Sequence, residues 1–195
     1  MIYKLNKKGE TLIEVITALT SLVLAGVAAV TVIISMMQSN AISKEYLIAQ
    51  NLAREGIEGV ITIRNTNWLR FPSTKSTDWL CVSANLNPLN CAARVNISNN
   101  YRLNYKNNEF ILEEKVSGTI APETGNIFQL NLYVQGSTLL YTHESGENSG
   151  FYRMIKFEQI DGSTDKYKVT ATVQWMNRSK VNEYKLSSII TNYAK

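Results

Sequence analysis

The longest uninterrupted pattern in the chain is apolar and lies near its N-terminus. From Val15 to Ser43 no residue is charged, a run of 29 positions filled mainly by aliphatic residues and methionine. An α-helix needs only about 20 apolar residues to cross the hydrocarbon core of a bilayer. Because the run is apolar on all sides and rich in small residues, it predicts a helix buried in lipid or among other helices.

The pattern changes after Met37, where apolar residues recur at intervals of three and four. Charged and polar residues fill the positions between them, so segment 38–65 predicts an amphipathic helix with one face against another layer. Residues 10–64, if helical throughout, would span about 80 Å at 1.5 Å per residue. The recurring apolar positions are Ile42, Tyr46, Ala49, Leu52, Ala53, Ile57, Val60 and Ile61.

The rest of the chain predicts a loop followed by a sheet. Residues 66–100 are rich in Ser, Thr, Asn and Pro, which is typical of an exposed connection. From Tyr101 onward, segments of alternating polarity predict antiparallel strands, the last of them over 184–191. One strand face over 151–160 carries Arg153 among aromatic and aliphatic residues. The inward positions of the next strand are Tyr167, Val169, Ala171, Val173 and Trp175.

Turn-forming residues separate these strands. Asn107-Asn108 and Gly136-Ser137 are candidate two-residue hairpin turns, and segment 161–165 is a turn around Gly162. A run of hairpins after one long helix predicts an α+β fold, with the helix packed on a C-terminal antiparallel sheet.

The residues that precede the apolar run form a motif. Lys7-Lys8-Gly9, one further residue, then Thr11-Leu12-Ile13-Glu14-Val15 resembles the class III signal of type IV prepilins and pseudopilins. The match is specific over residues 7–16. It implies that a membrane-embedded peptidase cuts after Gly9 and methylates the new amino terminus at Glu10. One position departs from the family, because most members begin the mature chain with phenylalanine.

The resemblance also implies a role for Glu14. In the family, the acidic residue at this place pairs with the free amino terminus of a neighbouring subunit, here that of Glu10. A carboxylate at the edge of the hydrocarbon is costly by a few kcal/mol, and this pairing would neutralise it. Thr11 and Glu14 also have the spacing of a capping box, so capping of its own helix is the alternative role for Glu14.

The expected organisation therefore has four parts. These are a leader (1–9), a membrane and assembly half of the helix (10–37), an amphipathic half (38–65), and a globular head (66–195) with a variable loop over 66–100. The chain is expected to be a non-enzymatic subunit of a type IV pilus-like filament, a minor pilin or pseudopilin. It would lie in the cytoplasmic membrane with its head outside, then in an extracellular filament. Its implied partners are other pilin subunits, the prepilin peptidase and the inner-membrane assembly platform.

Other functions are open at this point. Twitching pili, DNA-uptake pili and secretion pseudopili fit the sequence equally. A tip adhesin on a pilin stem is a second class, because Trp68, Phe71 and Trp79 could line a binding patch. The same rings could instead seal the helix against the sheet. A membrane-anchored enzyme is a third class and would need a convergent acid–base pair on the sheet.

An ordinary secretory signal competes with the prepilin interpretation of the N-terminus. Its cleavage site would lie near Ser39-Asn40-Ala41. The apolar core is longer than the usual 7–15 residues of such signals. In addition, Glu10 and Glu14 stand just before the core, where acidic residues are unusual. These features favour the prepilin interpretation.

The net charge gives little support to nucleic-acid binding. The whole chain carries 20 Lys and Arg against 16 Asp and Glu, a formal charge of +4. Residues 1–9 contain Lys4, Lys7 and Lys8 and no acid, so removing them leaves 17 against 16, or +1. Some competence pilins bind DNA, but nothing in this sequence argues for it.

The remaining candidate chemistry is sparse. Cys81 and Cys91 are the only cysteines, and outside the cell they would form one disulfide. The single histidine, His143, is expected on the surface of a strand, and no metal site or cofactor is expected. Asp161 and Asp165 flank a glycine turn but are too few for calcium. The remaining carboxylates that could suggest glycosidase chemistry are Glu113, Glu114, Glu144 and Glu147.

Overall fold

One helix dominates the first third of the chain. The structure is a computed structural model that describes residues 7–82, 91, 93–106, 109–115, 119–122, 127–135 and 138–193. Helix α1 (Lys7–Arg70) has 64 residues and contains a stretch long and apolar enough to cross a membrane. It begins three residues before the expected start at residue 10 and runs five residues past the expected end at residue 65.

The side chains of Asn67 and Trp68 hold the extra turn at the C-terminal end of α1 through contacts with distant residues. The Asn67 side chain donates hydrogen bonds to the carbonyl oxygens of Trp79 and Cys81, at 3.2 and 3.1 Å. The Trp68 indole donates to the Asn192 side-chain oxygen at 3.1 Å. These tertiary contacts hold the last turn in helical form where the local sequence predicts a loop.

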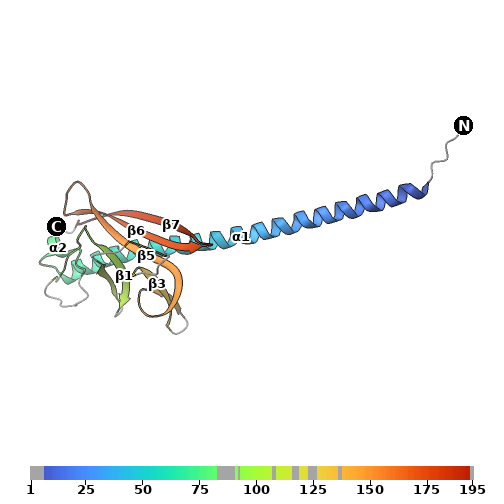
Figure 1. Ribbon diagram of the computed structural model, residues 1–195. Helices are drawn as coiled ribbons and strands as arrows, with labels where there is room; N and C mark the ends of the chain where they lie inside the picture. The colour runs from blue at the N-terminus through green and yellow to red at the C-terminus, as the bar shows by residue number, and fades with distance from the viewer. Residues whose placement is uncertain are drawn as a thin grey trace. The chain divides into compact units, whose positions relative to one another are not determined.

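The chain divides into two compact units, Met1–Glu45 and Tyr46–Lys195. We call the second unit the head. It contains the remainder of α1, a short helix α2 (Lys75–Asp78) and the whole sheet (Figure 1). In the first unit every side chain from Thr11 to Lys44 is exposed.

Among the described residues, seven antiparallel strands form one sheet. They are β1 (Asn100–Lys106), β2 (Glu109–Lys115), β3 (Gln129–Gln135), β4 (Thr138–Thr142), β5 (Glu147–Gln159), β6 (Lys166–Asn177) and β7 (Lys180–Thr191). The fold is thus α+β, with one long N-terminal helix and a C-terminal antiparallel sheet, as the sequence predicts.

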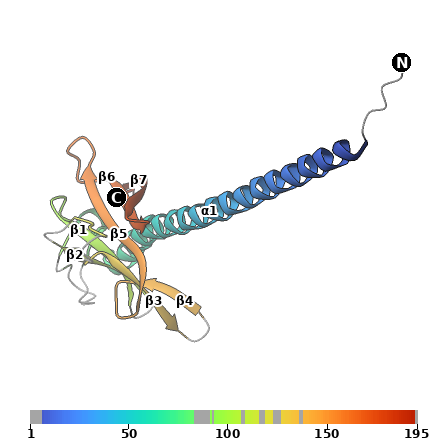
Figure 2. The same cartoon turned by 45° about the vertical axis from the view of Figure 1, so that its right-hand side comes forward.

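Strand β5 is the centre of this sheet and has three partners. Strand β6 pairs with it along residues 151–159. Because β6 fills one edge of β5, β1 and β3 must share the other edge. Strand β1 pairs with β5 only at Asn100 and Tyr101, and β3 pairs with the residues near the start of β5. The hairpins β1–β2 and β3–β4 therefore leave β5 at different points and diverge (Figure 2).

The core forms where the inner face of the sheet meets the head part of α1. The five predicted inward residues of β6 are all buried, which confirms the alternation. Close contact is possible because α1 carries glycines there. A Cβ on Gly56 would lie 2.9 Å from Ile155 Cδ1, and one on Gly59 would lie 3.0 Å from Leu103 Cδ1 and closer still to Cδ2. The helix residues of the core are Ala49, Leu52, Ala53, Ile57, Val60, Ile63 and Trp68.

The predicted turns have mixed outcomes. The strands flanking both two-residue candidates pair as expected, Lys106 with Glu109 and Gln135 with Thr138, while the turn residues themselves lie outside the described part. The turn around Gly162 is present, closed by a hydrogen bond from Ile160 N to Lys166 O. Strand β7 begins at Lys180 rather than residue 184, because a turn at 178–179 that the sequence did not indicate joins it to β6.

Candidate functional site

The residues that carry the prepilin resemblance all lie in the first unit. Gly9 and Glu10 belong to α1, and Glu14 follows within the same helix. The Glu14 side chain is exposed, and within the described part of the chain it makes no hydrogen bond or ion pair. Since α1 begins at Lys7, Thr11 and Glu14 lie inside the helix. They are not at its start, where a capping box would stand.

Four hydroxyl groups within the apolar segment, those of Thr17, Thr20, Ser21 and Thr31, donate to backbone carbonyls of their own helix. Thr17 donates to Glu14 O at 2.9 Å, and Ser21 donates to Thr17 O at 2.8 Å. Thr20 and Thr31 donate to carbonyls three or four residues earlier in the same way. Because each donor is satisfied internally, these residues add little polar cost in a lipid environment.

The cysteines lie where the chain leaves α2. The structure joins Cys81 to Cys91 in a disulfide with a Cα–Cα distance of 5.7 Å. Hydrogen bonds from Val82 N to Ala93 O, 2.9 Å, and from Val95 N to Leu80 O, 3.1 Å, pair the two flanking segments. Residues 83–90 and 92 of the expected variable loop lie outside the described part.

Loss of this disulfide should destabilise the head. Replacing Cys81 and Cys91 by serine is expected to lower the free energy of unfolding by about 2–3 kcal/mol, because the bridge closes a loop of roughly ten residues. Denaturant titration of the full chain in detergent, followed by tryptophan fluorescence, measures the change. A reductant should lower the denaturant concentration at which the native chain unfolds and should not change that of the double serine variant. Equal midpoints for oxidised and reduced native chain would contradict the prediction.

The aromatic rings of the expected binding patch are turned inward. Trp68, Phe71 and Trp79 are all buried, which supports the sealing role rather than a ring-lined surface. A groove of about 250 Å³ remains beside α2. Arg94 lines it and is held by Asp78, with its Nη2 2.7 Å from the carboxylate. The other lining residues are Ser76, Thr77, Trp79, Leu80, Val95, Thr164 and Tyr167.

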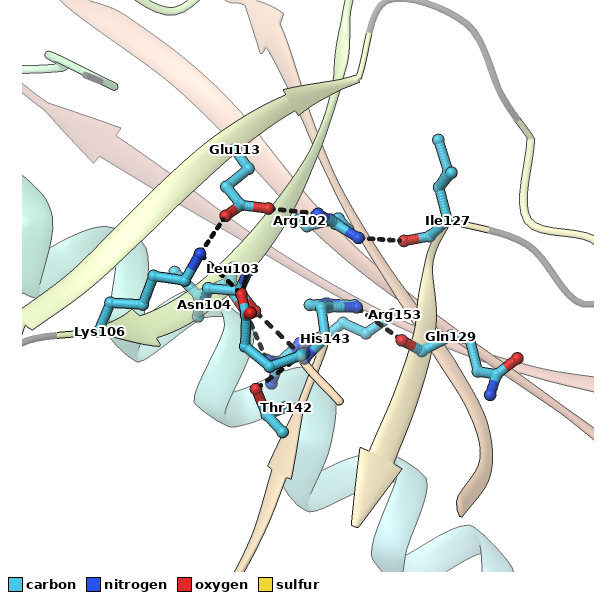
Figure 3. A network of polar contacts seen from close by, with 11 residues as sticks. Arg102, Leu103, Asn104, Lys106, Glu113, Ile127, Gln129, Thr142, His143 and Arg153 are labelled. Atoms are coloured by element: carbon cyan, nitrogen blue, oxygen red, sulfur yellow. Dashed lines mark hydrogen bonds and ion pairs between the residues drawn. The ribbon is translucent and has the colours of Figure 1, made fainter. Parts of the chain in front are cut away.

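A cluster of polar side chains lies in the gap where hairpins β1–β2 and β3–β4 diverge (Figure 3). Asn104 of β1 accepts a hydrogen bond from His143 N and donates one to Glu144, both at 3.2 Å. Lys106 bridges the hairpins, 3.1 Å from Glu113 and 2.7 Å from Glu144. Arg102 pairs with Glu113 and donates to Ile127 O, just before β3, at 3.2 Å. Side chains thus join two hairpins that no backbone ladder connects in the described part.

Arg153 anchors this cluster to the helix. Its side chain is 1% exposed. Its guanidinium donates to Leu52 O of α1 at 3.2 Å and to Leu103 O of β1 at 3.1 Å, and lies 3.2 Å from the Glu55 carboxylate. A charge buried to this degree needs such partners. The sequence contained a signal, since Arg153 occupies an inward position of an apolar strand face, but its partners could not be read from it.

Three members of the cluster have displaced pKa values, and hydrogen bonds to Glu144 and Glu113 raise that of Lys106. Burial would raise the pKa of Glu113, but hydrogen bonds from Lys106, Arg102 and Asn104 outweigh it and lower the pKa to about 2. Burial, followed by the nearby Arg153 charge, lowers the pKa of His143 to about 3. At neutral pH Glu113 is therefore ionised and His143 uncharged.

The expectation that His143 lies on the surface of a strand is wrong. Its side chain is 8% exposed, it follows the end of β4, and its Nδ1 lies 2.8 Å from Gln129 O. A carbonyl accepts, so Nδ1 carries the proton and Nε2 carries the lone pair. Tertiary packing of β3 against the segment after β4 produces this burial, which a lone polar residue in the sequence does not reveal.

The cluster as a whole is suited to holding the sheet together. Glu113 is tied to two cations and kept ionised, so it is a poor proton donor at neutral pH. Among the described residues, no three side chains of the metal-binding types gather into one group. His143 Nδ1 and the Arg153 guanidinium bond to backbone carbonyls, Arg153 also pairs with Glu55, and Asn104 bonds to His143 N and to the Glu144 side chain. Sequence reasoning missed this cluster because its members come from five separate segments.

Comparison with known proteins does not assign this chain to a family. No family model, no curated protein and no solved structure matches this chain. The long apolar N-terminal helix followed by an antiparallel sheet is compatible with a pilin-like fold.

Proposed function

We propose that the chain is a structural subunit of a type IV pilus-like filament, a minor pilin or pseudopilin. In this proposal a prepilin peptidase cuts after Gly9, and the chain is then assembled through its N-terminal helix. The chain performs no catalysis of its own. It is the substrate of the peptidase and a partner of like subunits and of the membrane assembly platform.

The observation that carries the proposal is the exposed apolar surface of α1. Every side chain from Thr11 to Lys44 is exposed, and the large apolar ones lie on all sides of the helix. Water does not favour a continuous apolar surface of this size, so lipid or other helices must cover it. A helix that leaves lipid and joins a bundle of like helices stays covered in both places.

Glu14 supplies the polar contact in this scheme. Its carboxylate has no partner in the described part of the chain, in a stretch that is otherwise apolar. The amine created at Glu10 of a neighbouring subunit would neutralise it and set the register between subunits. Glu10 would bring a second carboxylate close to that amine, which suits a subunit placed at the end of a filament more than one repeated along it.

The cleaved terminus tests this proposal directly. Protein recovered from the cell surface should begin at Glu10, with or without a methyl group, by intact mass and terminal sequencing. Gly9→Leu should leave the leader attached, since the peptidase reads the residue before the cut. Glu14→Gln should be cut normally but be absent from sheared filaments.

Glu58→Gln is the matched control for the glutamate variant. Glu58 is an exposed carboxylate on the head part of α1, within 4.0 Å of Arg54, and its loss should not change assembly. A surface chain that begins near Ala41 would indicate an ordinary secretory signal. One that keeps Met1 in a filament would show that cleavage is not required. Either result overturns the proposal.

A further inference from the structure

The turn between β6 and β7 lies at the end of the head where the chain enters it. The added Cβ of Gly56 would lie 3.2 Å from Ala171 Cβ, while the Tyr46 and Trp175 rings have centroids 5.0 Å apart. Moving forward along β6 thus means moving backward along α1. Because Tyr46 is the first residue of the head, the β6–β7 turn, which follows Trp175, lies at the entry end of the head.

This turn presents basic and apolar side chains together. Arg178 and Lys180 are exposed, and no ion pair among the described residues includes either of them. Met176 is exposed beside them, and Tyr46 and Leu47 are exposed on the helix at the same end. Glu45 precedes this group and carries the opposite charge. Aromatic, apolar and basic side chains in one place are typical of the boundary between a membrane and water.

The two residues of this turn have positive φ angles, a conformation that most side chains disfavour. Asn177 pairs with Lys180, so Arg178 and Ser179 form a two-residue turn with φ values of 48° and 66°. Glycine or asparagine is favoured at such positions, since other side chains crowd the backbone there. An arginine at this place is not explained by the turn geometry, which points to a use for its side chain.

The entry point of the head is close to the membrane by covalent connection. Met37 is the last residue of the strongly apolar run, and Tyr46 follows nine residues later in the same helix. Nine helical residues span about 14 Å. Whatever the angle between the two units, the surface around Tyr46 is held within that distance of the hydrocarbon edge.

We propose that the β6–β7 turn is a contact site for anionic phospholipid headgroups. Arg178 and Lys180 bind phosphate oxygens on the face of the membrane that the head occupies, while Met176 and Tyr46 meet the apolar side of the interface. The contact orients the head before assembly. This inference rests on the anchoring part of the proposed function and is independent of cleavage and filament assembly.

The test uses the uncleaved full chain reconstituted in lipid vesicles. A nitroxide on Ser179→Cys reports whether the turn is accessible to a water-soluble relaxation agent. One set of vesicles contains phosphatidylcholine alone, and the other contains equal amounts of phosphatidylcholine and phosphatidylglycerol. Each basic side chain near an anionic surface shifts the bound population about fivefold, so the pair should shift it about 25-fold between the two lipids. High salt should reverse the shift.

Charge variants separate this contact from a general electrostatic effect. Arg178→Asn with Lys180→Gln should abolish the lipid dependence, and asparagine suits the turn, so folding is preserved. Lys75→Gln with Lys166→Gln removes the same charge from α2 and from the start of β6, at the far end of that strand, and should leave the dependence intact.

The outcomes separate the two proposals. A chain washed out of both vesicle types at alkaline pH would overturn anchoring and this inference with it. A retained chain would leave the proposed function standing and would overturn the lipid contact in either of two cases. One is equal accessibility of the nitroxide in both lipids, and the other is a lipid dependence that survives the Arg178 and Lys180 changes.

Discussion

Replacement of Arg153 by leucine is expected to lower the free energy of unfolding by about 3–5 kcal/mol. The guanidinium is almost fully buried and donates to backbone carbonyls of α1 and β1 while pairing with Glu55. Leucine fills part of the volume but leaves both carbonyls and the Glu55 carboxylate without their donor. Denaturant titration of the full chain in detergent measures the loss, with tryptophan fluorescence as the signal, since all three tryptophans are buried in the head.

Lys156→Leu is the matched control for this change. Lys156 lies on the same strand, but its side chain is 48% exposed and lies 3.9 Å from Glu158. An exposed pair of this kind contributes little, so the variant should remain within about 0.5–1 kcal/mol of the native chain. If the Arg153 and Lys156 variants unfold at the same denaturant concentration, Arg153 does not anchor the sheet to the helix.

Acidification from pH 6.5 to 4.5 is expected to cost the folded head about 2–3 kcal/mol through His143 alone. The pKa of His143 is lowered to about 3 in the folded chain, from a usual value of 6.5, by burial and by the charge of Arg153. Below pH 6.5 the unfolded chain therefore takes up a proton that the folded chain refuses, and stability falls as the pH falls. Well above pH 6.5 His143 is unprotonated in both states, and its contribution to stability no longer varies with pH.

Titration of Glu113 adds a second loss of stability at lower pH. Its pKa of about 2 lies below the usual 4.5, so its ionised form stabilises the fold above pH 4.5 and that stabilisation is lost as the pH falls toward 2. The window from 6.5 to 4.5 thus isolates His143, the single histidine of the chain.

His143→Asn is the variant that tests this window. The asparagine amide can donate to Gln129 O much as Nδ1 does, and it does not titrate. Stability of native and variant chains, measured by denaturant titration at several pH values, should diverge in slope between pH 6.5 and 4.5 and run parallel above it. Identical slopes in that window would show that His143 is accessible to protons in the folded head.

The polar cluster gives the divided sheet a physical explanation. Strand β5 offers one free edge to two hairpins, and hairpins that twist away from a shared edge cannot continue pairing with each other. The side chains of Arg102, Asn104 and Lys106 replace the missing backbone bonds between them. The cluster therefore has a structural role in joining the two hairpins. The N-terminal helix is the part of the chain whose large apolar surface is not covered by the rest of the described chain.

The sequence by itself determined the elements whose signals are local. The uncharged run from Val15 to Ser43 and the three-and-four spacing after Met37 predicted one helix with two different halves. Strict alternation predicted the inward face of β6, and Gly162 marked its preceding turn. These patterns are readable because helical and strand periodicity depends on neighbours within a few residues.

Only the tertiary structure decided the arrangement of the strands and the state of the polar residues. Arg153 stood among apolar residues in the sequence, yet its partners lie 101, 50 and 98 positions away, at Leu52, Leu103 and Glu55. His143 looked like a surface residue because nothing near it in the chain indicates that β3 and the end of β4 enclose it. Burial and charge pairing depend on which distant segments meet, and that information is spread over the whole head.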